Sequence, residues 1–318
     1  MASKTTSSAV ESAPRILVTG AAGGKQGATG RVLTHFLLDR GVHVRALVRS
    51  DDDRADQLRA AGAEVIVGDL LSYDDMRQAV KGMDYMYYAF AVQDGLLEGS
   101  SIAAVVAAEA GLKGIVNNSQ WCSDLQSKSP QSRRHALAEA IFNAFPTPAV
   151  HLQGATYNIN MIAQLLPAAA QAGVLRAPSM AATDQLPLIA GIDVATAADT
   201  VLKDFSAFAG QAILMASQLR SLETLASDFS AALGKKVTFQ PISAETWEQD
   251  ITRNLPGFNP TGVEHLKALW EIMREGSHNR ELMARLRASQ PRLQLLVGKK
   301  PQTFEEELPA FLAARAKK

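Results

Sequence analysis

Residues 15–50, RILVTGAAGGKQGATGRVLTHFLLDRGVHVRALVRS, predict a β-α-β unit. A short apolar strand comes first, and a loop with five glycines follows it at once. The apolar spacing over 32–37 then predicts a helix that ends at Gly41, before a second strand over 42–48. Such a turn is an anion site, because glycine lets the backbone approach a diphosphate and free helix N–H groups face its charge. The residues expected at this cofactor site are Gly20, Gly23, Gly24, Lys25, Gln26 and Gly27.

The end of the second strand indicates which dinucleotide is bound. An acidic residue there contacts a ribose 2′-hydroxyl, whereas an arginine suits a 2′-phosphate. Here the strand ends with Val48, Arg49 and Ser50, and the first carboxylate is Asp51. We therefore expect NADP(H), with Arg49 and Ser50 at the phosphate. The alternative is that Arg49 is a solvated charge and Asp51 turns in to the ribose.

Strands and helices keep alternating as far as residue 155, which predicts a Rossmann-type, doubly wound parallel sheet. Ligands of such sheets bind at the carboxyl ends of the strands. The third strand ends in GDL, where Asp69 either contacts the adenine or starts a turn. The fourth ends in a segment small enough for its backbone to face a cofactor. The cofactor contacts expected at these two strand ends are Asp69, Leu70, Ala89, Phe90 and Ala91.

Composition excludes several classes of partner. The 318 residues carry 32 basic and 32 acidic side chains, so there is no electrostatic case for nucleic acid or an anionic membrane. A single cysteine, Cys122, excludes an intramolecular disulfide, and no Cys and His spacing would hold zinc or another metal. No apolar run is long enough to span a membrane. We expect a cytoplasmic protein that takes a small-molecule substrate; a homodimer is left open.

The chain divides into unequal parts in this interpretation. Residues 1–13 are small and polar and are expected to form a disordered tail. An NADP-binding domain over 14–155 is rejoined by 187–220. Residues 156–186 and 221–318 are expected to form a smaller, mostly helical substrate lobe, with too few strands for a second sheet. Asp193 is expected to cap a helix over 194–208.

Five features follow one another along the chain: VTGAAG at 18–23, GVHVRALVR at 41–49, GDL at 68–70, a serine after the fifth strand, and HLQGATYNIN at 151–160. In this order they resemble the NmrA-like family of the atypical short-chain dehydrogenase/reductase superfamily. The resemblance runs from about residue 14 to the C-terminus, because 192–202 and 221–247 are also similar to the family's second half. It implies an NADPH-dependent reductase of quinones, dyes or natural products, or a redox-sensing regulator without activity.

Two departures from that pattern bear on function. Gly20 and Gly23 reach the third glycine, Gly30, through four extra residues, about one helical turn. In addition, the superfamily's Tyr-x-x-x-Lys pair is replaced by Gln131 and His135. Because glutamine is no acid, a reductase must take its proton from His135, from Tyr157 or from water.

The resemblance also implies the remaining site residues. His135 is the first candidate for proton transfer, because imidazole titrates near neutral pH, or it is a solvated helix-start residue. Ser119 is expected to hydrogen-bond a substrate carbonyl or to be a turn residue. The other candidates are Tyr157 in catalysis, Gly154 and Ala155 beside the nicotinamide, and Trp121 and Asn158 at the substrate. The alternative for Asn158 is a helix cap, and a core role is favoured for Cys122.

Three functions remain open at this point. An NADPH-dependent reductase would deliver hydride to a carbonyl, a quinone or a conjugated double bond. A non-catalytic NADP(H) sensor would bind a partner protein, and the missing tyrosine supports it. An isomerase or epimerase using bound NADP has no distinguishing residue in this sequence.

Overall fold

The structure is a computed structural model that describes residues 13–24, 27–178, 180–254 and 259–316. The expected tail lies outside these ranges, apart from Ala13, and so do Lys25 and Gln26. Within the described ranges, no helix is both long and apolar enough to cross a bilayer.

The predicted first unit is present as β1 (Arg15–Thr19), α1 (Thr29–Asp39) and β2 (His43–Val48). β1 and β2 pair in parallel, with Arg15 opposite His43. α1 buries Leu33 and Leu37 completely, so the apolar spacing read from the sequence is the face that packs on the sheet.

A seven-stranded sheet forms the centre of the molecule, and every neighbouring pair of its strands is parallel. Its order is β10-β6-β5-β4-β1-β2-β3. The remaining strands are β3 (Glu64–Val67), β4 (Tyr85–Tyr88), β5 (Gly114–Gln120), β6 (Ala149–Gly154) and β10 (Ala212–Met215). The chain reverses direction across the sheet between β1 and β4, which is where open sheets of this kind bind ligands. The predicted Rossmann-type fold is confirmed.

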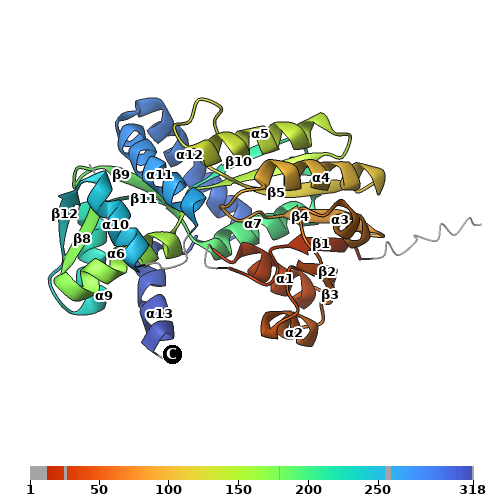
Figure 1. The fold of residues 1–318 in the computed structure, drawn as a ribbon, viewed down its shortest axis with the longest axis horizontal. Helices are drawn as coiled ribbons and strands as arrows, with labels where there is room; N and C mark the ends of the chain where they lie inside the picture. Colours follow the sequence, from red (N-terminus) through yellow and green to blue (C-terminus); the bar gives the residue numbers. More distant parts are fainter. Residues whose placement is uncertain (1–12, 25–26, 179, 255–258, 317–318) are drawn as a thin grey trace, which may run out of the picture.

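Helices cover both faces of this sheet (Figure 1). Alternate strand residues enter different cores: Ile16 and Val18 belong to one buried cluster, and Leu17 belongs to the other. The first face is covered by α1, α2 (Asp53–Ala60), α7 (Gly191–Lys203) and α12 (Arg280–Val297). The second is covered by α3 (Tyr73–Val80), α4 (Leu96–Glu109) and α5 (Pro130–Ala144).

The second half contains two small sheets, so the expectation of too few strands for a second sheet is wrong. One sheet pairs β9 (Gln185–Ile189) with β7 (Thr156–Tyr157) and β11 (Gln218–Ser221). The other pairs β8 (Val174–Pro178) with β12 (Thr238–Ile242). Helices surround these sheets in Figure 1. They are α6 (Asn158–Ala172), α9 (Leu222–Leu233), α10 (Ala244–Asn254), α11 (Pro260–His278) and α13 (Phe304–Ala316).

The helix after β9 begins earlier than predicted. α7 starts at Gly191, so Asp193 lies inside its first turn and does not cap it. Its Oδ2 instead accepts a hydrogen bond from the backbone N–H of Gln302, 2.9 Å away. The helix also ends at Lys203, and a short α8 (Phe205–Phe208) follows it.

Candidate functional site

The glycine turn after β1 has a geometry that other residues rarely adopt. Gly20 and Gly23 have φ angles of +67° and +70°, in the left-handed region, and the Gly23 N–H closes the turn on the Gly20 carbonyl at 3.1 Å. A Cβ on Gly30 would lie 2.7 Å from the carbonyl oxygen of Thr19. The third glycine therefore lets α1 pack directly against the end of β1.

The start of α1 is open to an anion. Its N-cap, Ala28, offers no capping side chain, and the first helical turn carries no acidic residue. Ala28, Thr29 and Gly30 line a cavity at this point. The free N–H groups and the positive end of the helix dipole are thus available to a ligand, so this part of the chain fits a diphosphate.

The extra segment of the glycine loop only partly follows the expectation. Gly24 lines the cavity and has open space around it. Lys25 and Gln26 lie outside the described residues. Gly27, expected near the cofactor, does not line the cavity: its α-carbon packs against the ring of Tyr157, and its carbonyl faces Gly191 at the start of α7. A Cβ on Gly191 would lie 2.2 Å from that oxygen.

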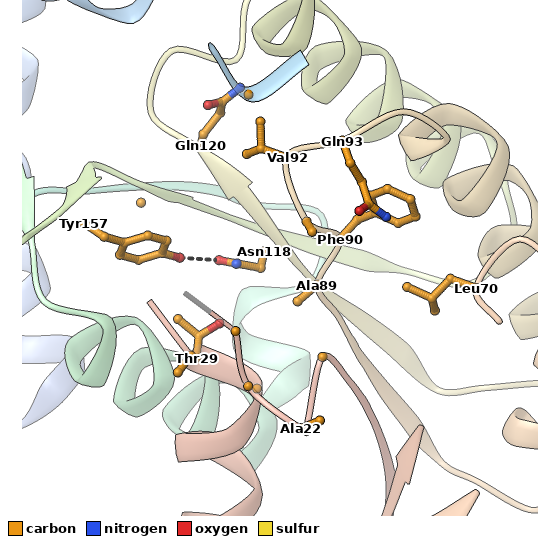
Figure 2. Close-up of a pocket in the computed structure, with 18 of the residues that line it drawn as sticks. Ala22, Thr29, Leu70, Ala89, Phe90, Val92, Gln93, Asn118, Gln120 and Tyr157 are labelled. Atoms are coloured by element: carbon orange, nitrogen blue, oxygen red, sulfur yellow. Dashed lines mark hydrogen bonds between the residues drawn. The ribbon is translucent and has the colours of Figure 1, made fainter. Parts of the chain in front are cut away.

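The cavity has a volume of about 460 Å³ and follows the carboxyl ends of the main-sheet strands (Figure 2). At its outer end lie the exposed side chains of Arg49 and Ser50, which the sequence predicted. Arg54 on α2 joins them, held by hydrogen bonds to Asp52. The alternative placing of Asp51 is not found, because its carboxylate pairs with Arg59 at 2.7 Å. The outer end therefore offers two guanidinium groups, of which that of Arg54 is already paired with Asp52.

Asp69 and Leu70 line the same end of the cavity. The Asp69 carboxylate also accepts the Leu71 N–H at 2.9 Å, so the predicted turn role is real. Its second oxygen accepts no hydrogen bond from a described residue and is available to a ligand.

The middle of the cavity is lined largely by backbone and small residues. They include Ala89, Phe90 and Ala91, which follow β4, and Gly154 and Ala155 at the end of β6. The Thr19 hydroxyl donates to the Ala89 carbonyl at 3.1 Å and accepts the Ala89 N–H at 2.8 Å. These two bonds hold the ends of β1 and β4 together beside the turn.

Tyr157 enters the inner part of the cavity and donates a hydrogen bond to the Asn118 side-chain oxygen at 3.2 Å (Figure 2). Burial raises its pKa to about 12, so the phenol stays neutral at physiological pH. The sequence did not identify Asn118, although it lies one residue before Ser119.

His135 lies on the cavity wall, but it is not the near-neutral acid that its residue type suggested. Its imidazole is buried, and burial together with the nearby His265 lowers its pKa to about 3. It also makes no hydrogen bond to any residue that the structure describes. A solvated helix-start histidine is equally wrong. His135 is a neutral imidazole at neutral pH.

Ser119 also lies on the cavity wall, and its hydroxyl donates to Glu139 on α5. The Gln153 amide donates to both oxygens of the same carboxylate at 3.1 Å. Glu139 is therefore the partner that orients Ser119 toward α5. A substrate carbonyl would have to compete with this carboxylate for the hydroxyl hydrogen.

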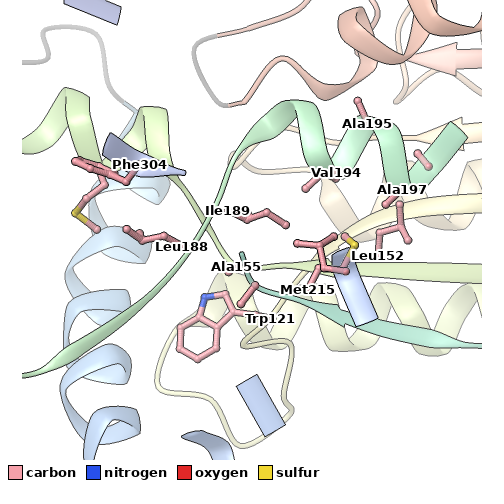
Figure 3. Close-up of a cluster of buried hydrophobic side chains, with 14 of the residues drawn as sticks. Trp121, Leu152, Ala155, Leu188, Ile189, Val194, Ala195, Ala197, Met215 and Phe304 are labelled. Carbon is pink, nitrogen blue, oxygen red and sulfur yellow. The ribbon is translucent and has the colours of Figure 1, made fainter. Parts of the chain in front are cut away.

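Trp121 lines the cavity and also belongs to the buried hydrophobic core (Figure 3). It lies beside Ala155, where the main sheet meets the three-stranded sheet. Cys122 does not line the cavity. Its sulfur lies 3.2 Å from the Ser132 hydroxyl, and burial raises its thiol pKa to about 11. This supports the core role predicted for the cysteine.

Asn158 does not line the cavity, although it was a substrate candidate. It starts α6, and its amide donates to Glu307 of α13 at 3.0 Å. Nor does its side chain cap the helix. Asn160, two residues on, lines the cavity instead, because the helix turns it to another face.

α11 closes the cavity from the substrate side, and no sequence motif identified it. Its N-cap, Asn259, bonds the carbonyl of Val92 at 3.0 Å, which fixes the helix over the loop after β4. One face then presents His265, Leu266 and Leu269 to the cavity. A single histidine among leucines predicts a core residue, and the sequence therefore did not identify this wall of the cavity.

The family model described as the NmrA-like family matches residues 12–306, most of the chain. The protein belongs to the NmrA-like family. Three solved structures that it resembles share 19–22% sequence identity with it, which shows the common fold.

One structure of this fold is the NADPH-dependent quinone oxidoreductase of Escherichia coli complexed with NADPH, with a TM-score of 0.78, 22% identity, and coverage of 93% of this chain and 99% of that one. A second is the Citrobacter triphenylmethane reductase complexed with NADP(H), with a TM-score of 0.77, 22% identity and coverage of 93% and 99%. The third is NmrA, a negative transcriptional regulator, in complex with NADP, with a TM-score of 0.76, 19% identity and coverage of 96% and 97%. The fold thus occurs in reductases and in a regulator.

A curated relative, a farnesyl-dihydroquinoline-oxide ketoreductase from Stigmatella aurantiaca, is 38% identical over 69 residues. The aligned part spans 22% of this chain and only 20% of that relative.

In this NmrA-like chain, Gln131, which the resemblance places at the superfamily's tyrosine position, is buried and does not line the cavity. The described residues hold no group of three or more His, Cys, Asp or Glu that could bind a metal.

Proposed function

We propose that this protein is an NADPH-dependent reductase that transfers hydride to a carbonyl, a quinone or a conjugated double bond. The observation that carries the proposal is one continuous cavity, which joins an uncapped helix start and a glycine turn to a buried, partly aromatic inner end. The family and the solved relatives named above support the cofactor assignment.

Different residues along the cavity would bind different parts of the cofactor. Gly20, Gly23 and the start of α1 would hold the diphosphate. Arg49 and Ser50, with Arg54 as an addition from the structure, would bind the 2′-phosphate, and Asp69 with Leu70 the adenine. When bound, the reduced nicotinamide supplies a hydride, which is one hydrogen with two electrons.

At the inner end, the substrate carbon gains the hydride and its oxygen must gain a proton. His135 and Tyr157 are both neutral there, so each would act as a neutral donor, or water would supply the proton. Gly154 and Ala155 leave room for the nicotinamide beside them. Much of the rate would come from holding the two reactants together in an enclosed space.

The test is to mix the purified protein with NADPH and a panel of quinones, enones and dyes, and to follow the loss of cofactor absorbance. Ser119→Ala and His135→Ala should reduce turnover. Ser101→Ala, on α4, and His35→Ala, exposed on α1, are the matched controls that should not.

The second candidate is an NADP(H) sensor without catalysis. Two features favour it. Gln131, at the position that the resemblance assigns to the tyrosine, does not line the cavity, and the buried histidines have pKa values far below neutral. Tight binding of both oxidised and reduced cofactor, with no turnover on any acceptor, would select the sensor over the reductase.

A further inference from the structure

His265 reaches the cavity from α11, and no motif or established role accounts for it. Only 5% of the residue is exposed. Its Nδ1 lies 2.9 Å from the hydroxyl oxygen of Ser129, the N-cap of α5. The contact therefore joins the wall of the substrate side to a helix of the nucleotide-binding side.

This contact favours one tautomer of His265. The Ser129 oxygen already accepts the N–H of Ser132 at 3.3 Å, as a helix cap. Within the described residues, its own hydrogen has no acceptor other than Nδ1 of His265. Nδ1 is then an acceptor, and the hydrogen of the neutral imidazole is on Nε2.

His265 is neutral as well as oriented. Burial lowers its pKa to about 4, so at neutral pH the ring has a single N–H to offer. Leu266 and Leu269 continue the same wall, with Trp121 also on the cavity. Such surroundings suit a neutral, flat molecule with an oxygen at its edge, and they disfavour a carboxylate.

We propose that His265 binds the oxygen of a neutral conjugated acceptor, a quinone or an aryl ketone, through its Nε2–H, and that Ser129 is the positioning residue that keeps the hydrogen there. The inference rests on the proposed reductase, and it specifies the substrate class of that same site. His135, which has no hydrogen-bond partner among the described residues, lacks such a fixed orientation.

The first experiment compares two kinds of acceptor. His265→Phe should lower kcat/KM for a quinone about tenfold, the cost of one hydrogen bond. A cationic triarylmethane dye without oxygen should lose less than about twofold, and NADPH affinity should not change. His265→Gln, which restores an N–H, should recover part of the quinone rate. Equal losses on quinone and dye, or no loss on either, would overturn the inference.

The second experiment reads the tautomer directly. Nitrogen-15 NMR of the imidazoles should show His265 with its hydrogen on Nε2. Ser129→Ala should shift it toward a tautomer mixture, whereas Ser129→Thr, which keeps the hydroxyl, should not. Ser72→Ala, which removes the equivalent cap of α3, is the control for losing a cap alone. A tautomer that is unchanged in Ser129→Ala contradicts the positioning role.

A third measurement separates this inference from the proposed function. A quinone is added to the protein with oxidised NADP, where no hydride is available, and the Nε2–H resonance of His265 is followed. If this resonance shifts on binding but no acceptor is turned over when NADPH is supplied, the role of His265 in binding the quinone is supported and the proposed reductase function is rejected. If the quinone is turned over but the resonance does not shift, and His265→Phe keeps the wild-type kcat/KM, the reductase function is supported and the role of His265 is rejected.

Discussion

The two ends of the cavity are built in opposite ways. The outer end is a turn of backbone and glycine with exposed cationic side chains, Arg49 and Arg54 among them. The inner end is a set of neutral side chains, among them the buried His135 and His265 and the half-buried Tyr157. The difference teaches that one end is suited to bind charge by geometry, whereas the other is suited to select an uncharged molecule by shape and by single hydrogen bonds.

The largest effect is expected from a substitution in the glycine turn at the outer end of the cavity. Gly30→Ala would put a Cβ 2.7 Å from the Thr19 carbonyl oxygen, so α1 must move away from β1. We expect the free energy of unfolding to fall by about 3 kcal/mol, the upper range for overpacking. Chemical denaturation measures it. Gly24→Ala, which meets no atom within 4 Å, is the control and should change the stability little.

The next effect tests the charge at the outer end. Arg49→Ala should weaken NADPH binding by about 10- to 100-fold, because a charged hydrogen bond contributes about 1.5–3 kcal/mol. NADH, which lacks the 2′-phosphate, should lose little. Calorimetry with both nucleotides measures the difference, and Arg59→Ala is the control. Equal losses for both nucleotides would remove the 2′-phosphate assignment.

A smaller effect should come from the burial of the inner end. His135 has a folded pKa of about 3, against about 6.5 for an unfolded histidine. Below about pH 6.5 the unfolded state therefore binds more protons than the folded state. The contribution of His135 to the free energy of unfolding is fully present above about pH 6.5 and falls as the pH drops toward the folded pKa. His135 should contribute up to about 1.4 kcal/mol per pH unit in this window.

Denaturation at several pH values checks this slope. His135→Gln should make the slope shallower between about pH 6 and pH 4, and His265, whose pKa burial lowers to about 4, should account for part of the slope that remains. His35→Gln, exposed on α1, should leave the slope as it is. Asp193 acts in the opposite sense, because burial raises its pKa to about 6. The comparison of variants cancels that contribution. An unchanged slope in His135→Gln would mean that the imidazole is not buried in its neutral form.

The smallest effect distinguishes two asparagines near the start of α6. Asn158→Ala should cost about 1 kcal/mol of stability, because Glu307 loses its hydrogen-bond partner, and it should leave KM for the acceptor unchanged. Asn160→Ala, on the cavity, should raise KM for the acceptor and leave the stability nearly unchanged. A raised KM in the Asn158 variant alone would return that residue to the substrate site.

The main sheet could be predicted because each of its units is local. Strand, turn and helix in the first unit lie within residues 15–50, and their periodicities are visible without a partner. The small sheets could not, because they pair strands that lie far apart in the sequence. Val174 of β8, for example, pairs with Thr238 of β12. A proline within β9, Pro187, further disguises that strand.

The site divides in the same way. Arg49 follows directly from its strand end, since the function of that position depends on a local motif. His265 could not be predicted, because its role depends on a hydrogen bond to Ser129, far away in the sequence. The protonation of His135 was also beyond reach, because its pKa depends on burial beneath segments that no local pattern brings together.

The extended glycine loop has a consequence for a distant part of the chain. Gly27 lies between the ring of Tyr157 and the backbone of Gly191, with no space for a methyl group at position 191. In this chain the longer loop therefore requires a glycine at the first residue of α7. In a family comparison, we expect loop length and the residue at position 191 to vary together.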